Sequence, residues 1–213
     1  MTKVKIKPYP IPEDEPESID DITLLEPTAI YSYADYLRWT FEERVELIKG
    51  KLFEMSPAPV RVHQEISINM LSQLIKYIKG KPCRVYHAPF DVRLAAGRGS
   101  KDEQVYSVVQ PDICIICDLS ILDEKGCNGS PSMVAEILSP STAKKDLTDK
   151  LSLYEENNIP EYWIIFPNDQ ILEVYLLRND GKYGAPTRYT KNDQVPVTVL
   201  GNALVDAGAL FRD

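Results

Sequence analysis

The chain has 213 residues, of which 44% are hydrophobic, and its 24 basic and 32 acidic residues give a formal net charge of −8. This length fits one domain with a core of its own. The acidic balance argues against binding nucleic acid through a broad positive surface, although it is compatible with an enzyme whose basic groups are confined to a cleft. No apolar run approaches the roughly 18 residues of a membrane span, and the first residues lack the apolar segment of a secretory signal.

The start of the chain predicts an extended or flexible N-terminal arm at residues 1–27, because prolines recur there among acidic residues. A plain solvated tail is the favoured interpretation, and an arm that packs on a partner subunit is the alternative. A single domain is expected over residues 28–213.

The first part of this domain predicts two helices and a β-hairpin. The shorter helix begins after the N-cap Ser32, and the longer one carries an apolar stripe and ends at Gly80. Lys49-Gly50 is typical of the turn of a hairpin. The two helices and the two hairpin strands are expected at residues 32–40, 60–79, 45–48 and 51–55.

Apolar runs predict the remaining strands. Pro111 interrupts one of these runs, and because proline has no N–H for the ladder it marks a strand start or an edge. The expected strands are at residues 83–87, 90–94, 105–117, 133–138, 161–166, 171–177, 183–189 and 195–199.

Residues 132–166 predict a βαβ unit, since a polar helix separates two apolar runs. Ser141 or Thr142 is expected to cap this helix, which runs to about Asn157. Its inward face is expected to consist of Leu147, Leu151 and Tyr154.

The four cysteines predict buried free thiols. Cys114 and Cys117 form a C-x-x-C pattern, but residues three apart in a strand face opposite sides and cannot share a tetrahedral metal. The default for all four, including Cys83 and Cys127, is therefore an unpaired buried thiol. A reducing, cytoplasmic compartment fits this expectation.

Glu136 stands inside the strand expected at residues 133–138, where an unpaired carboxylate would cost several kcal/mol. Asp112 opens the preceding strand, and Lys150 lies on the following helix. Two carboxylates on adjacent strands can share a divalent cation, and oxygen ligands with retained waters suit Mg²⁺. The lysine could hold an attacking water or stabilise the charge on a phosphate, and Glu46 could supply a third acid.

When each candidate residue is considered alone, a purely structural role is favoured over a functional one. Asp112 could cap a turn, Lys150 could be a solvated helix residue, and His63 is more often a surface residue than a neighbour of substrate phosphate. Glu136 could be the ion-pair partner of Lys144, Lys145 or Lys150. The combination of an acid inside VAEIL, an upstream proline-aspartate pair and a polar helix favours a functional site.

Several short motifs, in this order and spacing, resemble the Uma-two family of restriction endonucleases, over roughly residues 31–189. The proline-aspartate pair and Glu136 are similar to the signature of the restriction-endonuclease-like, or PD-(D/E)xK, superfamily. The motifs are ELIKG (46–50), His63-Gln64, PFDVRL (89–94), QPDI (110–113), VAEILSPST (134–142), Asp146, Lys150, Tyr154 and PEYWII (160–165).

The resemblance implies an α/β (α+β) fold with a restriction-endonuclease-like core, in which a central mixed β-sheet is flanked by helices. It also implies a phosphodiesterase site for Mg²⁺, with Mn²⁺ as a possible substitute. The implied metal ligands are Asp112, Glu136, the carbonyl of Ile137 and Glu46. The superfamily lysine should stand two residues after Glu136, where this chain has Leu138, so its role is expected to pass to Lys150. The implied substrate contacts are His63, Gln64, Ser139, Asp146 and Tyr154.

The first hypothesis is a cytoplasmic, Mg²⁺-dependent DNA endonuclease with Asp112, Glu136 and Lys150 as catalytic residues. A homodimer is expected, because two sites related by a two-fold axis can cut both strands. Its interface would lie at the C-terminal strands or the N-terminal arm. The alternative is a catalytically inactive binding or regulatory protein of the same fold, which the net charge and Leu138 favour. A third interpretation is a hydrolase of a small phosphoester or nucleotide.

Overall fold

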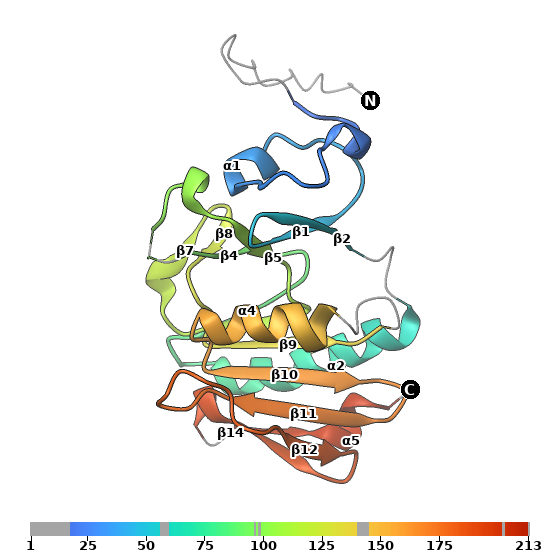
Figure 1. The fold of residues 1–213 in the computed structure, drawn as a ribbon. Coiled ribbons are helices and arrows are strands. Elements are labelled where there is room, and N and C mark those ends of the chain that lie inside the picture. The colour runs from blue at the N-terminus through green and yellow to red at the C-terminus, as the bar shows by residue number, and fades with distance from the viewer. Residues whose placement is uncertain are drawn as a thin grey trace, which may run out of the picture.

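A six-stranded mixed sheet forms the centre of the computed structural model, which describes residues 18–55, 60–95, 97, 99–139, 145–201 and 203–212 (Figure 1). Only the β9–β10 pair of this sheet is parallel, as the predicted βαβ unit requires. The predicted α/β fold with a central mixed sheet is therefore confirmed. In spatial order the strands are β12 (Thr187–Thr190), β11 (Ile171–Leu176), β10 (Glu161–Phe166), β9 (Met133–Ile137), β6 (Ile113–Ile116) and β3 (Arg84–His87).

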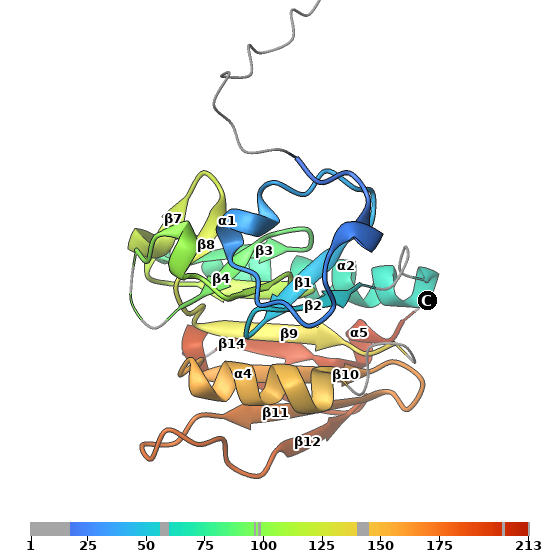
Figure 2. The ribbon, with the colours of Figure 1, turned by 45° about the horizontal axis from the view of Figure 1, so that its top comes forward.

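Helices cover both faces of the central sheet, with α2 (Arg61–Ile78) on one side and α4 (Leu151–Glu156) on the other (Figures 1 and 2). The inward stripe of α2 is the apolar stripe expected from the sequence, since its buried residues recur every four positions. Ile75 also fits the apolar spacing of this helix, but its side chain is 50% exposed. The buried residues of α2 are Ile66, Met70 and Leu74.

A second six-stranded mixed sheet packs against the α4 side of the first, which the sequence did not lead us to expect. Residues from both sheets and from α4 form one core cluster. The hairpin of β1 and β2 was predicted, and Gly50 in its turn has a φ of 77°, which favours glycine. In spatial order the strands are β2 (Lys51–Glu54), β1 (Val45–Ile48), β5 (Ser107–Val109), β4 (Val92–Leu94), β8 (Gly126–Asn128) and β7 (Leu122–Asp123).

The short helix α1 (Tyr33–Tyr36) packs against the second sheet. Ser32 caps it as predicted, and Asp35 completes a capping box with the N–H of Ser32. Tyr33 is buried in a separate cluster with Leu47, Val105 and Val108. The N-terminal segment meets this region through a bridge between Ile19 and Trp39 and a 3-10 turn at Ile22–Leu24; residues 1–17 of the expected arm lie outside the described residues.

The C-terminal residues form a hairpin and a helical turn on the α2 side of the central sheet. The hairpin consists of β13 (Gln194–Val197) and β14 (Ala203–Asp206), and α5 (Ala207–Leu210) follows it. The strand expected at residues 195–199 is thus largely correct. The strand expected at residues 183–189 begins only at Thr187, and β14 and α5 were not foreseen.

The expected inward face of the helix after β9 is partly wrong. A π-helical stretch at Asp146–Lys150 leads into α4. Tyr154 is buried as expected, but Leu147 is 36% exposed. Asp146 and Lys150 take the inward positions instead, because Lys150 pairs there with buried carboxylates. Ser141 and Thr142, the expected caps, lie outside the described residues.

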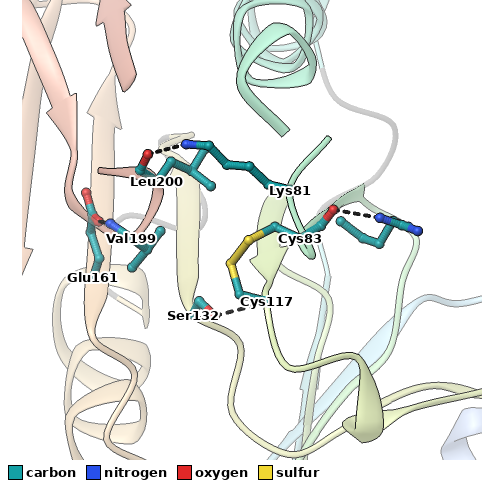
Figure 3. Close-up of a disulfide and its surroundings, with 8 residues drawn as sticks. Lys81, Cys83, Cys117, Ser132, Glu161, Val199 and Leu200 are labelled. Atoms are coloured by element: carbon teal, nitrogen blue, oxygen red, sulfur yellow. Dashed lines mark hydrogen bonds between the residues drawn. A yellow bond between two sulfur atoms is a disulfide. The ribbon is translucent and has the colours of Figure 1, made fainter. Parts of the chain in front are cut away.

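The expectation of four free thiols is wrong for Cys83 and Cys117, which form a disulfide (Figure 3). Strands β3 and β6 run antiparallel with Arg84 opposite Ile116, so the next pair in register is Cys83 and Cys117. Cys114 and Cys127 are buried free thiols as expected. The cytoplasmic location stays a prediction, and it loses the support of four unpaired cysteines.

No helix in the described part of the chain is long and apolar enough to cross a bilayer.

Candidate active site

Asp112 and Glu136 lie opposite each other on neighbouring strands. β6 and β9 run antiparallel with Ile113 opposite Ala135, and this register extended by one residue sets Asp112 opposite Glu136. Directly opposed residues of an antiparallel pair point to the same face of a sheet. Val134, two residues before Glu136 and thus on the same face, packs in the cluster shared with α4. Both carboxylates therefore point to the α4 side.

Asp112 is held by one of its two carboxylate oxygens. Oδ2 accepts a hydrogen bond from the backbone N–H of Ile137 at 2.7 Å and lies 3.1 Å from Nε2 of His63. Its side chain keeps 20% of its surface exposed, so the site reaches solvent at this acid.

Glu136 is buried and also held by one oxygen. Oε1 accepts hydrogen bonds from Nζ of Lys150 at 2.8 Å and from the hydroxyl of Tyr154 at 2.7 Å. Burial raises the pKa of Glu136 to about 8, against the attraction of Lys150 and with a further contribution from neighbouring carboxylates. The charged form of this acid thus depends on a nearby cation.

Lys150 supplies that cation in the structure. Its Nζ lies 2.9 Å from Oε1 of Glu46, 2.8 Å from Oε1 of Glu136 and 3.6 Å from Oδ1 of Asp146. Burial opposes its charge, but these carboxylates keep the pKa of Lys150 well above its ordinary value. The side chain is therefore a buried ammonium and not a solvated helix residue.

Glu46 is fully buried on β1 with both oxygens occupied. Oε1 contacts Lys150 and accepts a hydrogen bond from the N–H of Gln110 at 2.9 Å, and Oε2 accepts one from Nζ of Lys145 at 2.6 Å. Burial alone would raise its pKa, but the two lysines keep the pKa of Glu46 below its ordinary value. Lys145 was expected only as an alternative partner of Glu136, and the structure pairs it with Glu46.

The other expected site residues divide into two groups. The first group lies beside the charged residues described above: His63 contacts Asp112, Asp146 lies near Lys150, and Tyr154 donates to Glu136. Asp146 and Tyr154 are 2% and 0% exposed, so both contact protein groups in this structure. Gln64 is exposed in the first turn of α2, and Ser139 follows the end of β9.

Replacing Tyr154 with phenylalanine is expected to lower the free energy of unfolding by about 1.5–3 kcal/mol, because the hydrogen bond to the buried Glu136 is lost. Urea denaturation measures this change. Tyr77→Phe is the matched control, since no hydrogen bond of its hydroxyl is found among the described residues and the side chain is only partly buried. Equal effects of the two changes would contradict the assigned role of Tyr154.

Comparison with known proteins places the chain in a family. The model of the Uma2 (Uma-two) family, described as "Putative restriction endonuclease", matches residues 33–205. The chain belongs to the Uma2 family. The "Uncharacterized protein slr1290" of Synechocystis sp. is 22% identical over 170 residues, which cover 78% of this Uma2 chain and 84% of that protein. The crystal structure of "a putative nuclease belonging to DUF820" from Anabaena variabilis shares the fold, with a TM-score of 0.65, 20% identity and coverage of 85% of this chain and 97% of that one.

The residues of this Uma2 chain that could hold a metal ion are Asp112 and Glu136. Each uses one oxygen within the protein, and no described residue bonds Oδ1 of Asp112 or Oε2 of Glu136. In the described ranges no three His, Cys, Asp or Glu residues are grouped as a ready metal site. Two carboxylates completed by water and phosphate suit Mg²⁺, which keeps several waters in most protein sites.

Leu138, which stands where the resemblance led us to expect a lysine, packs against the core beside α4. Lys150 reaches Glu136 from the neighbouring helix instead. The resemblance to the Uma-two family had led us to expect Lys150 in this place. The pairing of Lys145 with Glu46 was missed, because 99 residues separate the two in the chain.

Proposed function

We propose that this Uma2 protein is a Mg²⁺-dependent endonuclease that hydrolyses DNA phosphodiester bonds. The observation that carries the proposal is the position of Lys150, whose Nζ lies 2.8 Å from Oε1 of Glu136. A carboxylate pair with an ammonium beside it is the charge arrangement that phosphodiester hydrolysis with a divalent cation uses. The family description supports the same reaction class.

Asp112 and Glu136 would hold the cation, with the carbonyl of Ile137 as a further oxygen ligand. Bound Mg²⁺ lowers the pKa of a water molecule and neutralises charge on the scissile phosphate. The protein's own part is orientation: the N–H of Ile137 fixes Asp112, and the hydroxyl of Tyr154 fixes Glu136. Lys150 favours the ionised form of Glu136, which is the form that binds a cation.

Lys150 acts in this proposal as a charged donor and not as a base. Its pKa is raised well above the ordinary value, so the ammonium keeps its proton at neutral pH. It would hold the attacking water by a hydrogen bond or stabilise negative charge on the phosphate. We assign Glu46 a positioning role, because both of its oxygens are bonded to ammonium or amide groups and hold Lys150 in place.

The DNA would approach from the exposed side of Asp112. His63 lies there with Nε2 on the Asp112 carboxylate, and its Nδ1 is buried with no hydrogen-bond partner among the described residues. In the imidazolium form of His63 this nitrogen carries a proton, which it could donate to a phosphate oxygen after a small ring movement. We also propose a homodimer, with one site for each DNA strand.

A second candidate function is a nuclease-fold protein that binds DNA without cutting it. The observation that favours it is the burial of the central groups, since Glu136 and Lys150 are each 3% exposed. Such burial gives a cation and a phosphate little direct access unless the site opens.

Supercoiled plasmid DNA incubated with Mg²⁺ or Mn²⁺ separates these two functions. The endonuclease is expected to produce nicked or linear DNA in a divalent-cation-dependent reaction that EDTA stops. Binding in a gel-shift assay without any cleavage, under the same conditions and with both cations, would favour the inactive protein.

A further inference from the structure

A pocket of about 370 Å³ is lined in part by Gln110, whose backbone N–H bonds Glu46 of the candidate active site, and it uses none of the acids of that site. It is lined by residues of β3, of the loop between β3 and β4 and of the β7–β8 hairpin, together with Gln110. Its volume is within the range of small-molecule sites, about 300–1,000 Å³. Gly126 lets the hairpin approach β4 closely, since a Cβ there would lie 2.4 Å from the carbonyl oxygen of Asp91 and its φ is +123°.

One wall of the pocket is a pair of parallel aromatic rings. Tyr86 and Phe90 stack with their centroids 4.2 Å apart and an angle of 8° between the ring planes. Both side chains are half-buried and line the pocket, so the pair contributes aromatic surface to it. A flat ligand can stack on such a surface, and a cation gains from the negative face of an aromatic ring.

Two carboxylates of the pocket, those of Asp91 and Glu124, are paired with no cation of the described residues. Among the described residues, Asp91 accepts hydrogen bonds from two neutral donors, the hydroxyl of Tyr33 at 3.0 Å and the side-chain amide of Gln110 at 2.8 Å. Glu124 makes no hydrogen bond or ion pair with any described residue. Counting the described residues alone, the pocket therefore has uncompensated negative charge beside its aromatic wall.

The remaining charged side chains of the pocket are paired with residues outside its lining. Asp123 accepts hydrogen bonds from Arg93 and from the N–H of Lys125 through Oδ1 alone, which leaves Oδ2 without a bond to the described residues. The Lys125 ammonium pairs with Asp102. No basic side chain of the described pocket lining is thus available to an anionic ligand.

The geometry points to a binding site for a guanidinium group, stacked on the Tyr86–Phe90 ring pair and paired with the carboxylates of Glu124 and Asp123. A guanidinium is planar, stacks on aromatic faces and presents paired N–H donors that match a carboxylate. An alkylammonium is compact and strongly hydrated, so it uses the ring surface less well. A neutral nucleobase could stack in the same place but would leave the charge of the pocket uncompensated.

NMR titration of the full chain with N-acetyl-arginine amide tests this site. The ring signals of Tyr86 and Phe90 are expected to shift saturably, and N-acetyl-lysine amide is expected to bind more weakly. Glu124→Gln should lower the affinity for the arginine probe by up to about fivefold, which is the effect of losing an exposed ion pair. Phe90→Leu should lower the same affinity by about two- to fivefold, because the contact with the ring is lost.

Glu54→Gln is the matched control, because it removes one exposed carboxylate from β2, outside the pocket. Agmatine and a Gly-Arg-Gly peptide distinguish a free guanidine from the side chain of a polypeptide, and tighter binding of either supports the site. Three results would overturn it: arginine and lysine probes that bind equally, a Glu124→Gln protein that binds like the Glu54→Gln control, or binding of neutral cytidine or guanosine in place of the arginine probe. The Glu124→Gln result decides the matter even if Phe90→Leu does not fold.

Discussion

Replacing Lys150 with methionine is expected to lower the free energy of unfolding by about 3–5 kcal/mol, because it leaves buried carboxylates without their cation. Nζ of Lys150 contacts carboxylate oxygens of Glu46, Glu136 and Asp146 at 2.9, 2.8 and 3.6 Å. The side chain of Lys150 is only 3% exposed, so water cannot take over these contacts. Urea denaturation of the purified protein measures the change.

Lys49→Met is the matched control for this experiment. Lys49 pairs with Glu156 at 2.7 Å, but the two side chains are 57% and 48% exposed, so the loss is expected to stay below about 1 kcal/mol. Adding Glu136→Gln to Lys150→Met should recover part of the stability, because one unpaired charge is removed. Similar small effects of Lys150→Met and Lys49→Met would show that Lys150 does not neutralise this cluster.

Asp112→Asn and Glu136→Gln are each expected to reduce Mg²⁺-dependent DNA cleavage by about 100-fold or more. Loss of an outer-shell partner of a metal ligand already lowers metal affinity or activity by about 10–100-fold. Loss of a ligand itself should lower activity by at least as much. The initial rate of plasmid nicking at saturating Mg²⁺ measures the effect.

Asp149→Asn is the control for these two variants, since Asp149 lies on the same π-helical stretch as Lys150 but is exposed. It is expected to cleave at the wild-type rate. Far-ultraviolet circular dichroism of all three proteins should show a retained fold. Cleavage that persists in Glu136→Gln at a wild-type rate would remove Glu136 from the mechanism.

The sequence predicts well those parts of the fold that depend on local patterns. The hairpin around Lys49-Gly50 and the helix α2 follow from turn chemistry and apolar periodicity. The βαβ unit follows from two apolar runs around a polar helix, and its strands β9 and β10 are parallel. In each case the signal and the structure lie within a few dozen residues.

The errors arise where distant parts of the chain meet. Cys83 and Cys117 are 34 residues apart, and only the register of β3 against β6 sets them opposite each other. Leu147 was assigned to the inward face by its hydrophobicity. Lys150 points inward instead. Leaving the buried Glu46 and Glu136 without a cation would cost more free energy than leaving Leu147 exposed to solvent.

The candidate site was predicted in its main members but not in its supporting contacts. Asp112, Glu136 and Lys150 stood out because charged residues interrupted or followed apolar runs, and the structure brings them to one face of the sheet. The interaction of Lys145 with Glu46 joins residues far apart in the sequence. No pattern near either residue indicates it.

Binding of Mn²⁺ followed by electron paramagnetic resonance tests the central claim, that Asp112 and Glu136 hold one divalent cation beside Lys150. The wild-type protein is expected to remove one Mn²⁺ per chain from solution, and added Mg²⁺ should displace it. Asp112→Asn and Glu136→Gln should each abolish this binding, whereas Asp149→Asn should retain it. Equal Mn²⁺ binding by the wild-type, Asp112→Asn and Glu136→Gln proteins would contradict the proposed site.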